Sequence, residues 1–339
     1  MKALLIGGTG QISSAVTRKL LRDGWEVWLL NRGNRSSDFT RNIHYIRADI
    51  NDEAAVAEAI RNLQFDSVCE WIGYTADQIE RDYRLFKDHT RQYIFTSSAT
   101  VYHKPPTDYR ISEGMSLCNP FSAYARNKMA CEEYLMKKFR EEGFPATIVR
   151  PSHTYDEKHI PLGVRGNKGF GQVIRRMKEG KPVIIQGDGT SLWTLTFNED
   201  FAVGYTGLMG NPLAIGEAFH ITGDEVLTWN QIYETIADTL GVTLHPYHIA
   251  SEFLTAVGPQ FDFEGGLLGD KIFSLTFDNT KLRKLVPAMG TTVPFHKGVR
   301  IALDYIQNHP ELLEEDPEFD AWCDRVIEGM EQLKTSLGS

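Results

Sequence analysis

The amino-acid sequence predicts an α/β protein built on a parallel, doubly wound sheet. Short apolar runs alternate with helix-patterned stretches over the first 150 residues, and a glycine-rich turn follows the first run directly. After Pro151 the pattern loosens, and glycine and proline become frequent from Ile160 to Gly189. Strands that alternate with helices form right-handed crossovers, which place helices on both faces of one sheet and ligands at the carboxyl ends of its strands.

Each predicted strand is a short apolar or β-branched run, and stretches with helical spacing separate most of them. We expect strands at Lys2–Ile6, Trp25–Leu30, His44–Arg47, Ser67–Glu70, Gln92–Thr96, Ala146–Val149 and Ala218–Thr222. We expect helices from the glycine turn through Leu21 and at Asp52–Leu63, Ala76–Asp88, Ser122–Glu142, Glu199–Met209 and Thr228–Leu240.

Composition limits the classes of partner. The net charge of -9 and the pI near 5.6 argue against a nucleic-acid backbone, although Arg32, Arg35 and Arg41 form one small basic cluster. The four cysteines lack CxxC spacing, no apolar run reaches membrane-spanning length, and no residue group has metal-ligand spacing. We therefore expect an acidic cytoplasmic protein with reduced thiols, no membrane segment and no metal.

The turn after the first strand has the composition of a dinucleotide-binding loop. Gly7, Gly8 and Gly10 permit a tight turn and the close approach of a pyrophosphate, whose charge a helix N-terminus favours. Ser13 stands where the third glycine of the usual pattern would be, and a purely structural turn is the alternative. The cofactor contacts expected here are Gly7, Gly10, Gln11 and Ile12.

The end of the second strand bears on the choice between NAD and NADP. The residues at that strand end are Asn31 and Arg32, so no carboxylate is present to bind a ribose 2′-hydroxyl. Arg32 and Arg35 could receive a 2′-phosphate. NADP(H) is slightly favoured, although Asn31 could hold a plain hydroxyl and the arginines could be solvated. Asp49, with Ile50 beside it, is a candidate adenine or ribose contact, with helix capping as the alternative.

Tyr124 and Lys128 lie four residues apart on one predicted helix, so both side chains point into one site. A lysine cation lowers the pKa of a nearby phenol, which lets the tyrosine act as a general acid or base toward an alcohol or carbonyl. Hydroxyl residues end the strand upstream, where Ser98, with Thr100 behind it, is the candidate partner of the oxygen that reacts. A serine in that place is otherwise a turn former.

The motifs IGGTGQIS, FTSSATVY, YARNK and VRPSHTY, in this order, resemble the extended short-chain dehydrogenase/reductases, also called the NAD-dependent epimerase/dehydratase family. The segments DSVCEWIGYTADQI, KPVIIQGDG and EAFHITGDEVLTWNQIYETIA are most similar to the branch with chloroplast stem-loop-binding-type and uncharacterised bacterial epimerase-like proteins. The resemblance implies a Ser98–Tyr124–Lys128 catalytic set. In such enzymes Lys128 also holds the nicotinamide ribose while Tyr124 exchanges the proton and hydride moves to or from the ring.

The resemblance also implies a division into domains. An NAD(P)-binding Rossmann domain is expected over residues 1–150, and a smaller α/β domain, mainly for substrate, over 151–339, with segments near 180–222 returning to the Rossmann core. Further cofactor contacts are expected at Thr96, Tyr124, Lys128, Pro151 and His153. Substrate contacts are expected at Ser98, Thr100, His153, Tyr155 and Trp193.

Three segments depart from the family pattern. The stretch Ala99–Thr100 offers no acid, so dehydration ranks low. Nucleotide-sugar members usually place a pyrophosphate-binding arginine where this chain has Trp193, which weakens the case for a UDP- or dTDP-sugar. Trp193 could stack on a substrate or belong to the core. His153, where many relatives have asparagine, could assist proton transfer or be a buried structural histidine.

We therefore expect an NAD(P)-dependent epimerase or oxidoreductase that acts on a sugar or sugar-nucleotide hydroxyl through hydride transfer and a keto intermediate. One alternative is an NADPH-dependent carbonyl reductase with a non-nucleotide substrate. Another is a non-catalytic nucleotide- or RNA-binding member of the fold. The expected partner is a small carbohydrate-like molecule, and the family resemblance suggests a homodimer through the helices at Ala76–Asp88 and Ser122–Glu142.

Overall fold

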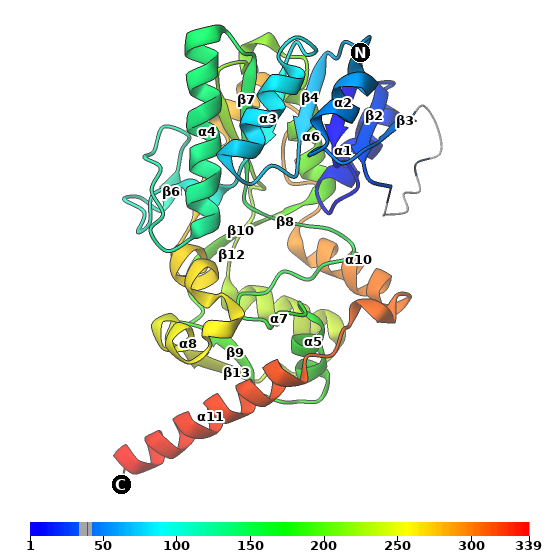
Figure 1. The fold of residues 1–339 in the computed structure, drawn as a ribbon. Helices are drawn as coiled ribbons and strands as arrows, with labels where there is room; N and C mark the ends of the chain where they lie inside the picture. Colours follow the sequence, from blue (N-terminus) through cyan, green and yellow to red (C-terminus); the bar gives the residue numbers. More distant parts are fainter. Residues whose placement is uncertain (34–38, 40–42, 339) are drawn as a thin grey trace. The chain divides into compact units, whose positions relative to one another are not determined.

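The computed structural model describes residues 1–33, 39 and 43–338, and the chain divides into two compact units (Figure 1). Unit 1 comprises Met1–Thr154, Thr194–Asp224 and Phe277–Thr292. Unit 2 comprises Tyr155–Trp193, Glu225–Thr276 and Val293–Ser339.

Unit 1 is built on a seven-stranded parallel sheet in the order β11-β7-β5-β4-β1-β2-β3. The strands β2 and β3 lie on one side of β1, and β4 and the later strands lie on the other side. This order is that of a doubly wound Rossmann sheet and confirms the predicted fold class. The strands are β1 (Lys2–Ile6), β2 (Glu26–Asn31), β3 (Ile43–Arg47), β4 (Ser67–Glu70), β5 (Tyr93–Thr96), β7 (Ala146–Pro151) and β11 (Ala218–Ile221).

Helices cover both faces of this sheet because successive strand side chains point to opposite sides. Ala3 and Leu5 of β1 pack in the cluster with α1 and α6, whereas Leu4 and Ile6 pack in the cluster with α2, α3 and α4. The helices of unit 1 are α1 (Ser13–Arg22), α2 (Glu53–Ile60), α3 (Ala76–Phe86), α4 (Ala123–Glu142), α6 (Asn198–Leu208) and α9 (Thr280–Leu285).

The longest helix of unit 1, α4, begins and ends where its sequence signals predict. The Ser122 side chain accepts a hydrogen bond from the Ala125 N–H at 3.2 Å, and Gly143 closes the helix with φ of 70°. These signals fix the register of the helix, and therefore the face that carries Tyr124 and Lys128.

Unit 2 contains α5 (Gly171–Lys178), β9 (Val183–Gln186), β12 (Val226–Thr228), α7 (Trp229–Leu240), β13 (Pro246–Ile249), α8 (Ser251–Val257), α10 (Phe295–Gln307) and α11 (Pro317–Leu337). The π-helix η4 spans Glu264–Lys271. β9 and β13 pair in parallel, and α7 packs on α10. Short strands β6 (Arg110–Ile111), β8 (His153–Tyr155), β10 (Leu192–Phe197) and β14 (Thr276–Phe277) complete the chain.

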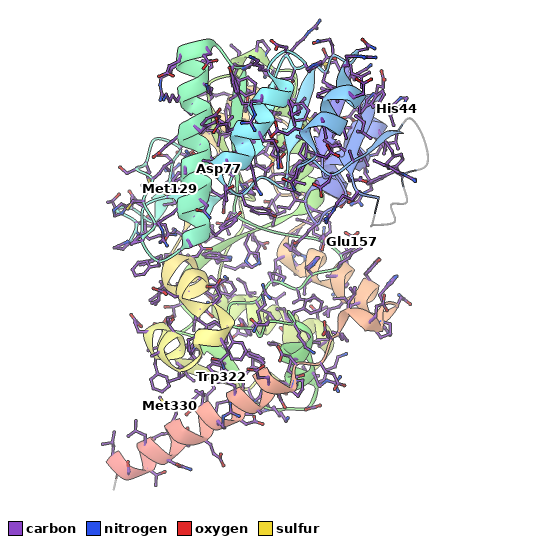
Figure 2. All side chains as sticks on the ribbon, viewed as in Figure 1. His44, Asp77, Met129, Glu157, Trp322 and Met330 are labelled. Atoms are coloured by element: carbon purple, nitrogen blue, oxygen red, sulfur yellow. The ribbon has the colours of Figure 1, made fainter. Side chains whose placement is uncertain are left out.

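The C-terminal helix α11 contributes aromatic side chains to the core of unit 2. Phe319 and Trp322 stack, and Phe261 packs edge-on against both. Figure 2 labels Trp322 and Met330 on this helix, where both line an apolar hollow of about 470 Å³. Among the residues that the structure describes, no helix is both long and apolar enough to cross a membrane.

The glycine turn after β1 combines a left-handed backbone with close packing. Gly8 has φ of 81°, and a Cβ atom there would lie 2.5 Å from Leu29 Cδ2 and 3.2 Å from Leu5 Cβ. Glycine is therefore required at this position for two separate reasons, backbone conformation and space.

We predict that Gly8→Ala destabilises the protein more than Gly24→Ala, its matched control. Gly24 also has a positive φ, of 79°, but nothing lies within 4 Å of its Cβ position. The control should cost about 1 kcal/mol from backbone strain alone, and Gly8→Ala about 1–3 kcal/mol more from overpacking. Urea unfolding measures both, and equal losses would show that the contact with Leu29 relaxes freely.

Candidate active site

Unit 1 holds a cavity of about 590 Å³ at the carboxyl ends of its central strands. Every predicted cofactor contact lines it except His153: Gly7, Gly10, Gln11, Ile12, Asn31, Arg32, Asp49, Ile50, Thr96, Tyr124, Lys128 and Pro151. A crevice at the carboxyl ends of parallel strands, at the point where the strand order reverses, is where doubly wound sheets bind ligands.

One end of the cavity is an anion-binding helix terminus. The Gly7 N–H donates to the Leu30 carbonyl at 3.0 Å, which ties the turn to β2. At the start of α1 the N-cap residue Ile12 supplies no capping side chain, and the first turn carries no acidic residue. A helix leaves its first N–H groups without intrahelical partners, so this end of the cavity fits a pyrophosphate.

Gln11 is held in place from both sides. Its side-chain amide donates to the Thr154 carbonyl at 3.1 Å, and its own carbonyl accepts from the Asn198 side chain at 3.2 Å. These bonds join the glycine turn to Thr154 of β8 and to Asn198 at the start of α6.

The other end of the cavity is polar and contains Asn31, Arg32 and Asp49. The Asn31 side-chain oxygen accepts from the Gly33 N–H at 2.9 Å, and Arg32 has an exposed side chain. Asp49 accepts from both the backbone and the side chain of Asn51, at 2.9 and 3.0 Å. Asp49 therefore caps no helix; Asp52 caps α2 instead. Arg35 and Arg41 lie outside the described residues.

Lys128 is a buried side chain of the cavity wall. It is 2% exposed, and its ammonium donates to the carbonyls of Gly73 and Thr96, each at 2.8 Å. Its Nζ lies 4.7 Å from the ring centroid of Phe95, 4.9 Å from that of Tyr74 and 5.7 Å from that of Tyr124. Burial lowers the pKa of Lys128 to about 8, although the negative charges of nearby groups oppose the shift.

Tyr124 lies one helical turn before Lys128 and is much more open. Its side chain is 43% exposed, and its ring lies 6.3 Å from that of Tyr74, which also lines the cavity. The structure therefore brings together the predicted tyrosine and lysine with the tyrosine toward solvent and the lysine behind it.

Ser98 and Thr100 follow Thr96, whose carbonyl binds Lys128, but they are not among the residues that line the cavity. Ser98 is the N-cap of the short 3-10 helix η1 (Ala99–Val101), and its hydroxyl accepts from the N–H of Thr100 at 3.2 Å and from the Thr100 hydroxyl at 2.9 Å. The neighbouring Ser97 lines the cavity instead, 2% exposed and with no hydrogen-bond partner for its Oγ.

The remaining predicted substrate contacts lie elsewhere in their units. His153 begins β8 and is half-buried. Tyr155 is 1% exposed and packs against Phe295 in unit 2. Trp193 is 2% exposed, with its ring 5.3 Å from that of Trp229. Tyr155 and Trp193 therefore present almost no surface to a ligand in this structure.

Several cavity residues are absent from the sequence prediction. Arg81 on α3 is the most notable, because it donates to Asn51 at 2.7 Å and to its buried neighbour Asp82 at 2.8 and 2.9 Å. A charged residue inside a helix gives no sequence signal that it faces a ligand. The lining residues that sequence reasoning missed also include Thr9, Asn51, Trp71, Ile72, Gln78 and Ser97.

Glu70, at the end of β4, lies buried behind the cavity. Its carboxyl accepts from the Ile72 N–H, and burial raises its pKa well above the usual range, with the charge of Asp82 adding to the effect. Asp82 in turn accepts from Arg81 and from the Tyr93 hydroxyl. We therefore take Glu70 as the neutral member of this pair and Asp82 as the ionised one.

The part of the chain that the structure describes holds no cluster of three His, Cys, Asp or Glu side chains able to bind a metal ion. The apolar hollow of unit 2 contains Arg325 as its one charged residue.

The family model for the NAD dependent epimerase/dehydratase family matches residues 3–221. Chloroplast stem-loop binding protein of 41 kDa b from Arabidopsis thaliana is 26% identical over 253 residues, which cover 71% of this chain and 63% of the plant protein. UDP-glucose 4-epimerase from Mycolicibacterium smegmatis is 25% identical, over 91% of this chain and 99% of that enzyme.

The fold is also similar to the solved structure of UDP-glucuronic acid 4-epimerase from Bacillus cereus in complex with UDP-glucuronic acid and NAD. Its TM-score is 0.71 and its sequence identity 20%, over 91% of this chain and 99% of the bacterial one. The match with the plant protein confirms the predicted branch. With the family model covering the sheet, the glycine turn and the Tyr124–Lys128 helix, the chain belongs to the NAD dependent epimerase/dehydratase family.

Proposed function

We propose that this protein is an NAD(P)-dependent epimerase or oxidoreductase that acts on the hydroxyl of a sugar or sugar nucleotide, with Tyr124 as its general acid and base. The observation that carries the proposal is the buried Lys128 ammonium, fixed by two backbone carbonyls one helical turn from the open Tyr124. The UDP-glucose 4-epimerase from Mycolicibacterium smegmatis, which is similar to this chain over nearly the whole length of that enzyme, supports the same substrate class.

The cavity residues fit a bound dinucleotide. The first turn of α1 would hold the pyrophosphate, Asn31, Arg32 and Asp49 the adenosine ribose, and Lys128 the nicotinamide ribose. When bound, NAD supplies a carbon that accepts and returns hydride. The remaining steps belong to side chains of this chain.

Lys128 has one donor to spare. An ammonium carries three N–H groups, and two of them are occupied by the Gly73 and Thr96 carbonyls. The third N–H is available to a ribose hydroxyl, and the positive charge stabilises the phenolate of Tyr124. Tyr124 can then take the proton from a substrate hydroxyl and return it at the same oxygen.

Ser98 would orient that substrate oxygen. A hydroxyl has two lone pairs and one proton, and both lone pairs of Ser98 accept hydrogen bonds from Thr100. Its O–H is therefore directed away from Thr100 and can donate to the oxygen that Tyr124 deprotonates. Thr100 acts through Ser98 in this scheme and does not touch the substrate itself.

A carbonyl reductase with a non-nucleotide substrate is the second candidate. One observation favours it: Trp193, which replaces the usual pyrophosphate-binding arginine, is buried against Trp229 and offers no charge.

The non-catalytic alternative, an RNA-binding member, has the plant relative's name in its favour. The net charge of -9 and the assembled Tyr124–Lys128 pair count against it.

We predict that Tyr124→Phe lowers turnover by roughly 10²–10⁴-fold while leaving NADH affinity unchanged, because only the proton carrier is lost. Interconversion of UDP-glucose and UDP-galactose, and reduction of free keto sugars, measure turnover; fluorescence titration measures NADH binding. Tyr134→Phe, on the same helix but packed against Tyr83, is the control and should keep full activity. Full turnover by Tyr124→Phe would exclude its role in proton transfer.

We predict a pH-dependent stability difference between the wild type and Lys128→Met. The folded pKa of about 8 is below the ordinary value of 10.5, so the unfolded chain binds more protons between these values. Stability of the wild type relative to the variant should therefore rise by about 3 kcal/mol from pH 8 to pH 10.5.

Urea unfolding at several pH values tests this difference, and Lys137→Met, an exposed lysine of the same helix, is the matched control. The control should show no such rise. A flat difference for Lys128→Met would mean that its amine is not desolvated.

We predict that Arg32→Ala weakens NADPH binding by about tenfold or more and NADH binding much less, because a charge-assisted bond to the 2′-phosphate is lost. Calorimetric titration of both cofactors tests this, with the exposed Arg61→Ala as control. Equal losses for both cofactors would assign Arg32 to another part of the dinucleotide and favour NAD(H).

A further inference from the structure

A series of hydrogen-bonded side chains runs from the core of unit 1 to the polar end of its cavity. The Tyr93 hydroxyl donates to Asp82 Oδ2 at 2.8 Å, and Arg81 donates to Asp82 Oδ1 from Nε at 2.9 Å and from Nη2 at 2.8 Å. Arg81 Nη1 donates to Asn51 Oδ1 at 2.7 Å, and Asn51 Nδ2 donates to Asp49 Oδ1 at 3.0 Å. An unbroken series of bonds therefore connects β5 with Asp49.

Burial decreases along this series. Tyr93 and Asp82 are 0% exposed and Arg81 is 6% exposed, whereas Asn51 has an exposed side chain. Arg81, Asn51 and Asp49 line the cavity, and Tyr93 and Asp82 do not. The series therefore begins on residues that the core holds in place and ends on residues that a ligand can reach.

The buried end of the series fixes the orientation of Arg81. Both carboxylate oxygens of Asp82 carry a partner, one from Arg81 and the other from Tyr93. A planar guanidinium that binds one acceptor through two adjacent N–H groups cannot turn about its own axis. The direction of Nη1 is therefore set by Asp82 before any ligand binds.

Asn51 is the link between this fixed arginine and the cavity wall. Its side-chain oxygen accepts from Arg81, so its amide nitrogen is directed the other way, toward Asp49. The backbone N–H of Asn51 donates to the same oxygen of Asp49, at 2.9 Å. Two donors on one carboxylate oxygen hold the Asp49 side chain in a single orientation.

The second oxygen of Asp49 keeps its capacity to accept. Among the described residues, none donates a hydrogen bond to Oδ2, because both bonds from Asn51 go to Oδ1. A carboxylate oxygen on a cavity wall binds the N–H or O–H donors of a ligand. Adenosine carries both kinds of donor, on its amino group and on its ribose.

We propose that Arg81 is a positioning residue, which acts through Asn51 to hold the Asp49 carboxylate in the orientation that binds the adenosine of the dinucleotide. The inference rests on the proposed function, which places that adenosine at this end of the cavity. An Asp49 side chain without these bonds would have to lose its rotamer freedom when the ligand binds, and this loss lowers affinity.

Titration of the full chain with three ligands tests this role. The probes are NADH, ADP-ribose and reduced nicotinamide mononucleotide, of which only the last lacks adenosine. We expect Asn51→Ala to lower the affinity for NADH and for ADP-ribose by the same factor, about three- to tenfold, and to leave the affinity for the mononucleotide unchanged. Asn62→Ala, at another exposed asparagine of unit 1 outside the cavity lining, is the matched control and should change none of the three.

Two further variants separate the route through Asn51 from a direct contact. Arg81→Lys keeps a positive charge beside the buried Asp82, which preserves the fold, but lacks the planar fork that also reaches Asn51. It should lower NADH affinity by about the same factor as Asn51→Ala, and the double variant should lose no more than either single variant. Asn51→Asp should lose at least as much as Asn51→Ala, because a carboxylate accepts from Arg81 but donates nothing to Asp49.

Unchanged NADH affinity in Asn51→Ala, or an equal loss for the mononucleotide, would overturn the positioning role. Additive losses in the double variant would also overturn it, because Arg81 would then contact the dinucleotide itself. Each of these results leaves a wild type that binds NADH, so the proposed function would stand. A wild type that binds no dinucleotide would overturn both.

Discussion

The hydrogen bonds from the Lys128 ammonium to the Gly73 and Thr96 carbonyls are the interaction on which the candidate site depends. They join α4 to the end of β5 and to the loop after β4, three pieces of chain far apart in sequence. A buried cation is tolerated because both bonds are charge-assisted. The same bonds fix the direction of the third N–H.

The groups behind Lys128 preserve its charge without neutralising it. Glu70 is buried nearby, and an ionised carboxylate there would draw the ammonium away from the cavity. Burial and the charge of Asp82 raise the pKa of Glu70 well above its usual range, which favours its neutral form, while Asp82 pairs with Arg81 at 2.8 Å. The charge of Asp82 is thereby paired within α3.

The sequence predicted the features that depend on residues close together in the chain. The glycine turn and the Ser122-to-Gly143 helix follow from backbone conformation and capping, which neighbouring residues determine. Tertiary contacts decided the rest. The presence of Arg81 in the cavity wall depends on how α3 packs, and the burial of Trp193 depends on Trp229. No spacing rule within one segment reports such contacts, so the sequence left both positions open or unnoticed.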